Sequence, residues 1–136
     1  MSDARGRGRI LVLDDDPRER AHSVEALGQG GYRVDTATTK AEVVTLLGRH
    51  DYDLVLSDLK MPGLNGPTLC QVLKESCRGA IPPVIFLLHK GYTPEYANFL
   101  MRLAAPVLMK PVRAADLRQA VERVVPAPRA TSTVGS

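Results

Sequence analysis

DLVLSDLKMPGLNG, residues 53–66, joins a short apolar run to a turn and the start of a helix. Leu54 to Ser57 is nearly continuous in aliphatic character, which is typical of a strand that helices cover on both faces. Asn65-Gly66-Pro67 then supplies residues that commonly open a helix. The stretch therefore predicts one strand–helix unit with Asp58 at the carboxyl end of its strand.

Four further apolar runs, at residues 10–13, 32–34, 84–88 and 107–109, repeat this pattern along the chain. Helical stretches are expected to begin at Pro17, at Thr39, at Asn65 and at Thr93 or Pro94, and a fifth has its apolar face at Leu117, Ala120, Val121 and Val124. Alternating strands and helices predict a parallel sheet with right-handed crossovers. Five such units in 136 residues favour an open, doubly wound α/β sheet over an eight-stranded barrel.

The chain has the length of one domain, which we place at residues 9–125. Residues 1–8 are expected to form a flexible lead and residues 126–136, rich in proline and small residues, a flexible tail or linker. The net charge of +3 is modest, so direct nucleic-acid binding is not expected. No run is long and apolar enough to span a membrane, and we expect a cytoplasmic protein.

Charged residues stand at the ends of three predicted strands. The first strand is followed by Asp14-Asp15-Asp16, the third ends at Asp58, and Lys110 follows the fifth. Ligands of open α/β sheets bind beyond the carboxyl ends of the strands, so these side chains should meet at one edge. Clustered carboxylates repel one another unless a divalent cation joins them, and Mg²⁺ takes such oxygen ligands together with phosphate. A lysine beside the metal would neutralise a phosphoryl group.

Aspartates after strands also serve as helix caps, and Asp16 before Pro17 can be read in that way alone. The coincidence of the acidic cluster, Asp58 and Lys110 on three strand ends favours a functional site over caps alone.

The segments ILVLDDDP at 10–17, DLVLSDLKMPGLNG at 53–66, Pro83-Val-Ile and Lys110-Pro111 resemble the receiver domains of bacterial response regulators and hybrid histidine kinases. The resemblance runs from about residue 9 to residue 125. It implies a flavodoxin-like fold with strand order 2-1-3-4-5. It also implies a phosphoacceptor signalling domain rather than an enzyme, one that can catalyse its own phosphorylation and slow dephosphorylation.

By this resemblance, Asp58 takes a phosphoryl group from a histidine kinase or a phosphotransfer protein. Asp15 would bind Mg²⁺ directly and Asp14 through water, and the backbone carbonyl of Lys60 would be a further ligand. Lys110 would contact the phosphoryl oxygen and precede a cis peptide bond to Pro111. A downstream protein target is expected, and pairing of two copies through the fourth helix and fifth strand is left open.

Two positions depart from the family pattern. Receiver domains usually end the fourth strand with Thr or Ser, where this chain has Leu88, and usually carry an aromatic residue where it has Val107. Leucine has no hydrogen-bond donor. A shifted alignment would bring His89 or Lys90 to the first position, and Thr93 is the first hydroxyl in the loop. We therefore expect retained phosphorylation with an atypical conformational readout.

Lys60 and His89 are possible modulators of the phosphoryl group, and a solvent-exposed position is the alternative for each. Two other functions were considered for the whole domain. One is a pseudo-receiver that binds proteins without phosphorylation. The other is a phosphatase of the haloacid dehalogenase type. Those enzymes carry an acid/base aspartate two residues after the nucleophilic aspartate. This chain has Lys60 at that position, so the sequence disfavours this function.

Overall fold

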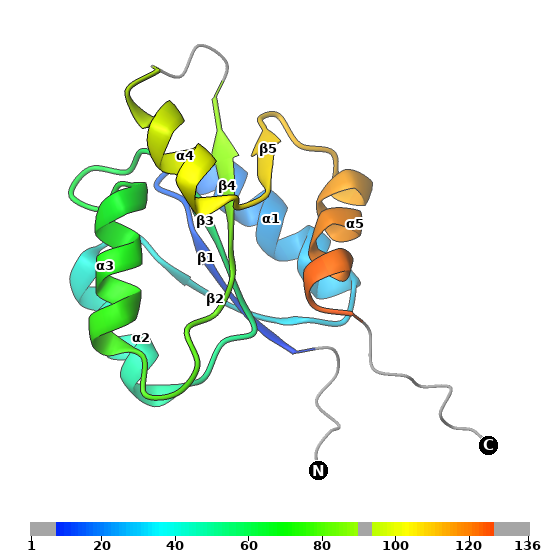
Figure 1. Ribbon diagram of the computed structural model, residues 1–136. Helices are drawn as coiled ribbons and strands as arrows, with labels where there is room; N and C mark the ends of the chain where they lie inside the picture. The colour runs from blue at the N-terminus through cyan, green and yellow to red at the C-terminus, as the bar shows by residue number, and fades with distance from the viewer. Residues whose placement is uncertain (1–7, 90–93, 127–136) are drawn as a thin grey trace.

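The computed structural model describes residues 8–89 and 94–126, and a five-stranded parallel sheet lies at its centre (Figure 1). The strands are β1 (Arg9–Leu13), β2 (Arg33–Ala37), β3 (Leu54–Asp58), β4 (Val84–Leu88) and β5 (Val107–Met109). Their order is β2-β1-β3-β4-β5, and all neighbouring pairs are parallel. This confirms the doubly wound sheet that the sequence predicted and the strand order that the resemblance implied.

Helices cover both faces of the sheet (Figure 1). They are α1 (Pro17–Gln29), α2 (Lys40–Arg49), α3 (Gly66–Ser76), α4 (Ala97–Leu103) and α5 (Ala114–Val124), and a 3₁₀ turn, Pro94–Tyr96, precedes α4. α1 and α5 pack on the sheet face that carries Ile10, Leu54 and Ile85. α2, α3 and α4 pack on the opposite face. No helix within residues 8–89 and 94–126 has the length and apolar character to cross a membrane.

Side chains cap the first three helices. The carboxylate of Asp16 accepts hydrogen bonds from the backbone N–H groups of Glu19 and Arg18, which lower the pKa of Asp16. The Thr39 and Asn65 side chains accept from backbone N–H groups in the same way. Asp16 is thus a helix cap, the reading that the sequence left open for it. Gly48, which follows the apolar positions of this helix, predicts a helix end there, but α2 continues through Arg49.

The segment before β5 contains the shortest of the described α-helices. α4 has seven residues and no side-chain cap, and it ends at Ala104 in a left-handed conformation with φ 55°. Its Phe99 ring packs edge-on against Phe86, with ring centroids 5.7 Å apart. A Cβ atom at Gly66 would lie 2.8 Å from the Phe99 ring, so α4 approaches α3 closely at a glycine. Thr93, one of the two predicted helix starts, lies outside the described residues.

The predicted lead and tail also lie outside the described residues, apart from Gly8 and Pro126. Gly8 has φ +134°, a conformation that favours glycine, and its carbonyl accepts a hydrogen bond from the Arg33 backbone N–H at 2.8 Å. Gly8 therefore belongs with the start of the sheet in the structure.

Candidate functional site

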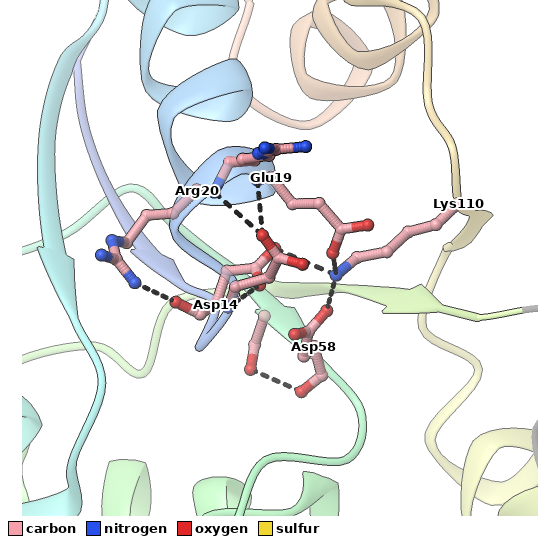
Figure 2. Close-up of polar contacts among 8 residues, drawn as sticks. Asp14, Glu19, Arg20, Asp58 and Lys110 are labelled. Atoms are coloured by element: carbon pink, nitrogen blue, oxygen red, sulfur yellow. Dashed lines mark hydrogen bonds and ion pairs between the residues drawn. The ribbon is translucent and has the colours of Figure 1, made fainter.

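Three strands deliver charged side chains to one edge of the sheet (Figure 2). Asp14 directly follows β1, Asp58 is the last residue of β3, and Lys110 directly follows β5. The strands run parallel, so these carboxyl ends face the same side. The Lys110 ammonium nitrogen, Nζ, lies 3.0 Å from Asp14 Oδ2 and 2.5 Å from Asp58 Oδ1. The side chains that the sequence expected to meet are therefore in contact.

The site is buried, and burial governs its electrostatics. Asp14, Asp58 and Lys110 expose 0%, 2% and 6% of their surface. Burial alone would lower the pKa of Lys110, but the surrounding carboxylates raise it above its ordinary value, so the lysine remains charged. Burial, together with the nearby Asp14 carboxylate, raises the pKa of Asp58 to about 7, although Lys110 opposes the change.

Asp14 is held in place from two sides. Its Oδ1 accepts a hydrogen bond from the Asp16 backbone N–H at 2.9 Å, and its Oδ2 pairs with Lys110. The Arg20 guanidinium donates to the Asp14 backbone carbonyl at 2.8 Å, which ties the end of β1 to α1 (Figure 2). The position of the Asp14 carboxylate is therefore fixed by the chain itself.

Asp14, Asp15 and Asp58 form a set of oxygen donors suited to a cation. Each offers one carboxylate oxygen, and these three oxygens lie within 4.8 Å of one another. Asp58 Oδ1 is buried with no hydrogen bond of ordinary geometry, and the ion pair with Lys110 is what neutralises it. Asp15 is exposed at the mouth of the site. Hard divalent cations such as Mg²⁺ take such carboxylate oxygens, so the donor set fits the ion that the sequence predicted.

Other predicted site residues lie apart from this cluster. The side chains of Lys60 and His89 are exposed, which agrees with the solvent-exposed alternative for each. No contact of either side chain with Asp58 is found in the described part of the chain. The peptide bond between Lys110 and Pro111 is cis, as the resemblance implied.

The two atypical positions have opposite environments. Leu88 is the last residue of β4, 2% exposed and packed in the core with Phe86. Its carbonyl accepts a hydrogen bond from the Lys110 backbone N–H at 2.7 Å. Val107 starts β5 and is 37% exposed. Leu88 thus occupies the strand end itself, while Lys90 and Thr93, named for a shifted alignment, lie outside the described residues.

One residue of the site was missed by sequence reasoning. Glu19, in the first turn of α1, places its Oε1 2.5 Å from the Lys110 ammonium (Figure 2). An acidic residue in the first turn of a helix is common, because it complements the helix dipole. Its position in the sequence therefore gave no sign of a contact with a lysine 91 residues away.

The family comparison identifies the kind of domain. The family model of the response regulator receiver domain matches residues 10–122, a range that contains Asp14, Asp58 and Lys110. The chain belongs to the response regulator receiver family. It is therefore a receiver domain of two-component signalling systems, as the resemblance implied. Receiver domains are signalling phosphoacceptors, they interact with histidine kinases or phosphotransfer proteins, and they typically bind Mg²⁺ at an acidic pocket.

Individual relatives agree with this assignment. The chain is 34% identical over 118 residues to the positive alginate biosynthesis regulatory protein of Pseudomonas aeruginosa, with 84% of this chain and 46% of that protein covered. It is 32% identical over 129 residues to the response regulator Rre1 of Synechocystis, with 93% and 55% covered. The chain thus spans about half the length of these curated relatives.

A solved structure extends the agreement to three dimensions. The signal receiver domain of a signal transduction histidine kinase from Syntrophus aciditrophicus superposes with a TM-score of 0.73 and 26% identity. The match covers 95% of this chain and 94% of that one. Receiver domains attached to kinases and receiver domains of regulators are therefore both similar to this chain.

Proposed function

We propose that Asp58 of this receiver accepts a phosphoryl group from the phosphohistidine of a histidine kinase or phosphotransfer protein. The observation that carries the proposal is the ion pair between Asp58 and Lys110 at the carboxyl edge of the sheet, with Oδ1 and Nζ 2.5 Å apart. The pair puts a fixed positive charge beside the carboxylate oxygen, where the oxygens of an incoming phosphoryl group would gather.

The proposed reaction transfers one phosphoryl group. A carboxylate oxygen of Asp58 attacks phosphorus, the phosphorus–nitrogen bond of the phosphohistidine breaks, and the imidazole leaves with the bonding electrons. The product is an acyl phosphate on Asp58. Water later attacks phosphorus, the bond between phosphorus and the Asp58 oxygen breaks, and inorganic phosphate departs. We include phosphorylation from small donors and slow self-catalysed hydrolysis in the proposal, since both need only the same positioned groups.

The same residues would hold Mg²⁺. We assign Asp15 and Asp58 as direct ligands, the backbone carbonyl of Lys60 as a further ligand, and Asp14 as a ligand through water. The assignment of Asp14 is supported by its existing partners, because the Asp16 backbone N–H and Lys110 already take both of its oxygens. When bound, the ion neutralises negative charge on the phosphoryl oxygens.

The proposal retains an atypical readout. Leu88 has no hydroxyl to bind a phosphoryl oxygen, and its side chain fills the core. Val107 has no ring that could move between a buried and an exposed position. Phosphorylation would then change partner binding at the surface around Asp58 rather than through a rearrangement of Leu88 and Val107. No observation on the described residues specifically favours the phosphorylation-independent interaction module.

We propose α4 and β5 as the surface through which two copies of the chain would pair. Exposed apolar side chains gather there, namely Met101, Leu103, Val107 and Met109. We propose the surface around Asp58 for the downstream target, and we propose that the domain acts in the cytoplasm.

Exposure to phosphoramidate and Mg²⁺ tests the proposed function. Intact mass should show one added phosphoryl group, which hydroxylamine removes because an acyl phosphate is labile to it. Asp58→Asn should show no such group, and Asp53→Asn, which changes an exposed aspartate just before β3, should behave like the wild type. Lack of any adduct on the folded wild-type protein would refute the proposal.

A further inference from the structure

Glu19 contacts Lys110 but has no role in the proposed phosphoryl transfer to Asp58. Its backbone N–H donates to the Asp16 carboxylate at 3.2 Å, which fixes the first turn of α1. From this turn its side chain reaches the Lys110 ammonium, with Oε1 and Nζ 2.5 Å apart. Figure 2 shows the Glu19 and Asp58 side chains approaching the ammonium from different elements.

One positive charge is therefore shared among three carboxylates, those of Asp14, Glu19 and Asp58. Asp14 and Asp58 take part in the proposed metal site and phosphoryl transfer. Glu19 lies outside the set of carboxylate oxygens that could hold the metal. Its contact with Lys110 thus neutralises the lysine without contributing a metal ligand.

Glu19 lies on the more exposed side of this ion pair. Its side chain is 35% exposed, whereas that of Lys110 is 5% exposed. A cavity of about 250 Å³ beside the pair is bounded by α1 and by the segment after β5, with Ser23, Val112 and Leu117 in its wall. The two side chains can therefore separate without displacement of the packed core.

We propose that Glu19 is a positioning residue that competes with the phosphoryl group for Lys110 and so weakens the hold of the domain on that group. The inference rests on the proposed function, because it assumes that phosphoryl oxygens take the place of the Asp58 carboxylate beside Lys110. A phosphoryl group carries more negative charge than the carboxylate it replaces, so it gains most from a lysine that no other carboxylate neutralises.

Binding of beryllofluoride, a mimic of the phosphoryl group, provides the test. Wild type, Glu19→Gln, Glu19→Asp and Glu25→Gln are titrated with beryllofluoride in the presence of Mg²⁺, and separately with Mg²⁺ alone, by calorimetry. Glu25 is an exposed residue of the same helix and serves as the matched control. The ¹⁵N signal of the Lys110 ammonium is recorded in each protein to report its partners directly.

Glu19→Gln should bind beryllofluoride about threefold to tenfold more tightly than wild type, equivalent to about 0.7 to 1.4 kcal/mol. Its affinity for Mg²⁺ alone should not exceed that of wild type. Without the Glu19 carboxylate, the positive charge of Lys110 is less neutralised and repels the cation more strongly. Glu19→Asp, which keeps the charge on a shorter side chain, should lie between wild type and Glu19→Gln, and Glu25→Gln should match wild type. The Lys110 signal should shift in Glu19→Gln and not in Glu25→Gln.

Beryllofluoride binding that is unchanged or weaker in Glu19→Gln would overturn the inference. Weaker binding of both beryllofluoride and Mg²⁺ would point to a purely structural role and would overturn it as well. A wild-type protein that takes neither a phosphoryl group nor beryllofluoride would instead contradict the proposed function. Failure of the inference and failure of the proposed function are thus separate results.

Discussion

Lys110 and Asp58 come from strands that are not neighbours, yet their charged groups are 2.5 Å apart. β4 lies between β3 and β5, and the Lys110 side chain extends from the end of β5 across this interval (Figure 2). The contact depends on the register of β4 and β5, in which Leu88 pairs with Met109 and the Lys110 backbone N–H donates to the Leu88 carbonyl. The sheet therefore positions Lys110 beside Asp58.

Replacement of this lysine should impair phosphoryl transfer. Lys110→Ala removes the positive charge beside Asp58, and we expect the initial rate of phosphorylation by phosphoramidate to fall on the order of 100-fold. Binding of Mg²⁺ alone should not weaken, because the carboxylates lose a competing cation. Rates are measured by intact mass over time, with Lys74→Ala, an exposed lysine of α3, as the control. Equal rates for Lys110→Ala and wild type would contradict the assigned contact.

Without divalent metal, the raised pKa of Asp58 should make stability depend on pH. The pKa rises from 3.8 to about 7, chiefly through burial, so between these values the folded state binds a proton that the unfolded state has released. The free energy of unfolding should therefore fall as pH rises from about 4 to about 7. Urea unfolding in a chelator, compared between wild type and Asp58→Asn, measures this contribution.

Asp58→Asn cannot carry this charge, so its stability should decline less over the same interval. Mg²⁺ should oppose the decline in the wild type, since the cation stabilises the charged carboxylate. The opposite result, a wild-type protein that gains stability relative to Asp58→Asn as pH rises in chelator, would show that Asp58 ionises easily in the folded state.

The end of β4 should not tolerate the hydroxyl that is usual in the family. Leu88 is 2% exposed and packs in the core, so Leu88→Thr loses apolar contacts and buries a polar group. We expect a loss of about 2 kcal/mol in the free energy of unfolding, and about 1 kcal/mol for Leu88→Val, which has the shape of threonine without its hydroxyl. Urea unfolding checks both values. A Leu88→Thr protein as stable as wild type would contradict the packing described for this residue.

The α4–β5 surface should respond little to phosphorylation. Leu88 and Val107 supply neither a hydroxyl nor an aromatic ring, so we expect beryllofluoride with Mg²⁺ to shift amide signals mainly around Asp14, Asp58 and Lys110. Two-dimensional NMR spectra with and without beryllofluoride measure the shifts, and Asp58→Asn controls for effects of the additives. Large shifts confined to α4 and β5 would contradict this prediction.

Much of the fold could be predicted because its signals are local. The bounds of β4 and β5 match the apolar runs 84–88 and 107–109, since buried strands read as continuous aliphatic segments. The Asp14, Asp58 and Lys110 contacts followed from the rule that the carboxyl ends of parallel strands share an edge. Position at a strand end, rather than proximity in sequence, made these contacts predictable.

The remainder depends on packing that the sequence does not display. In the sequence, Glu19 is an ordinary acidic residue of a first helical turn. It belongs to the site only because the Lys110 side chain extends to its carboxylate. Glycine is a frequent helix end, yet α2 continues past Gly48 through Arg49. The 3₁₀ turn before α4 likewise has no separate sequence signal.

Chemical trapping of the acyl phosphate tests the central claim most directly. The protein is treated with phosphoramidate and Mg²⁺, reduced with borohydride, which converts an aspartyl phosphate to homoserine, and mapped by peptide mass spectrometry. A sample without phosphoramidate is the control. The account predicts homoserine at position 58 only in the treated sample. Homoserine at Asp14 or Asp15, or at no position in a protein shown to be folded, would contradict it.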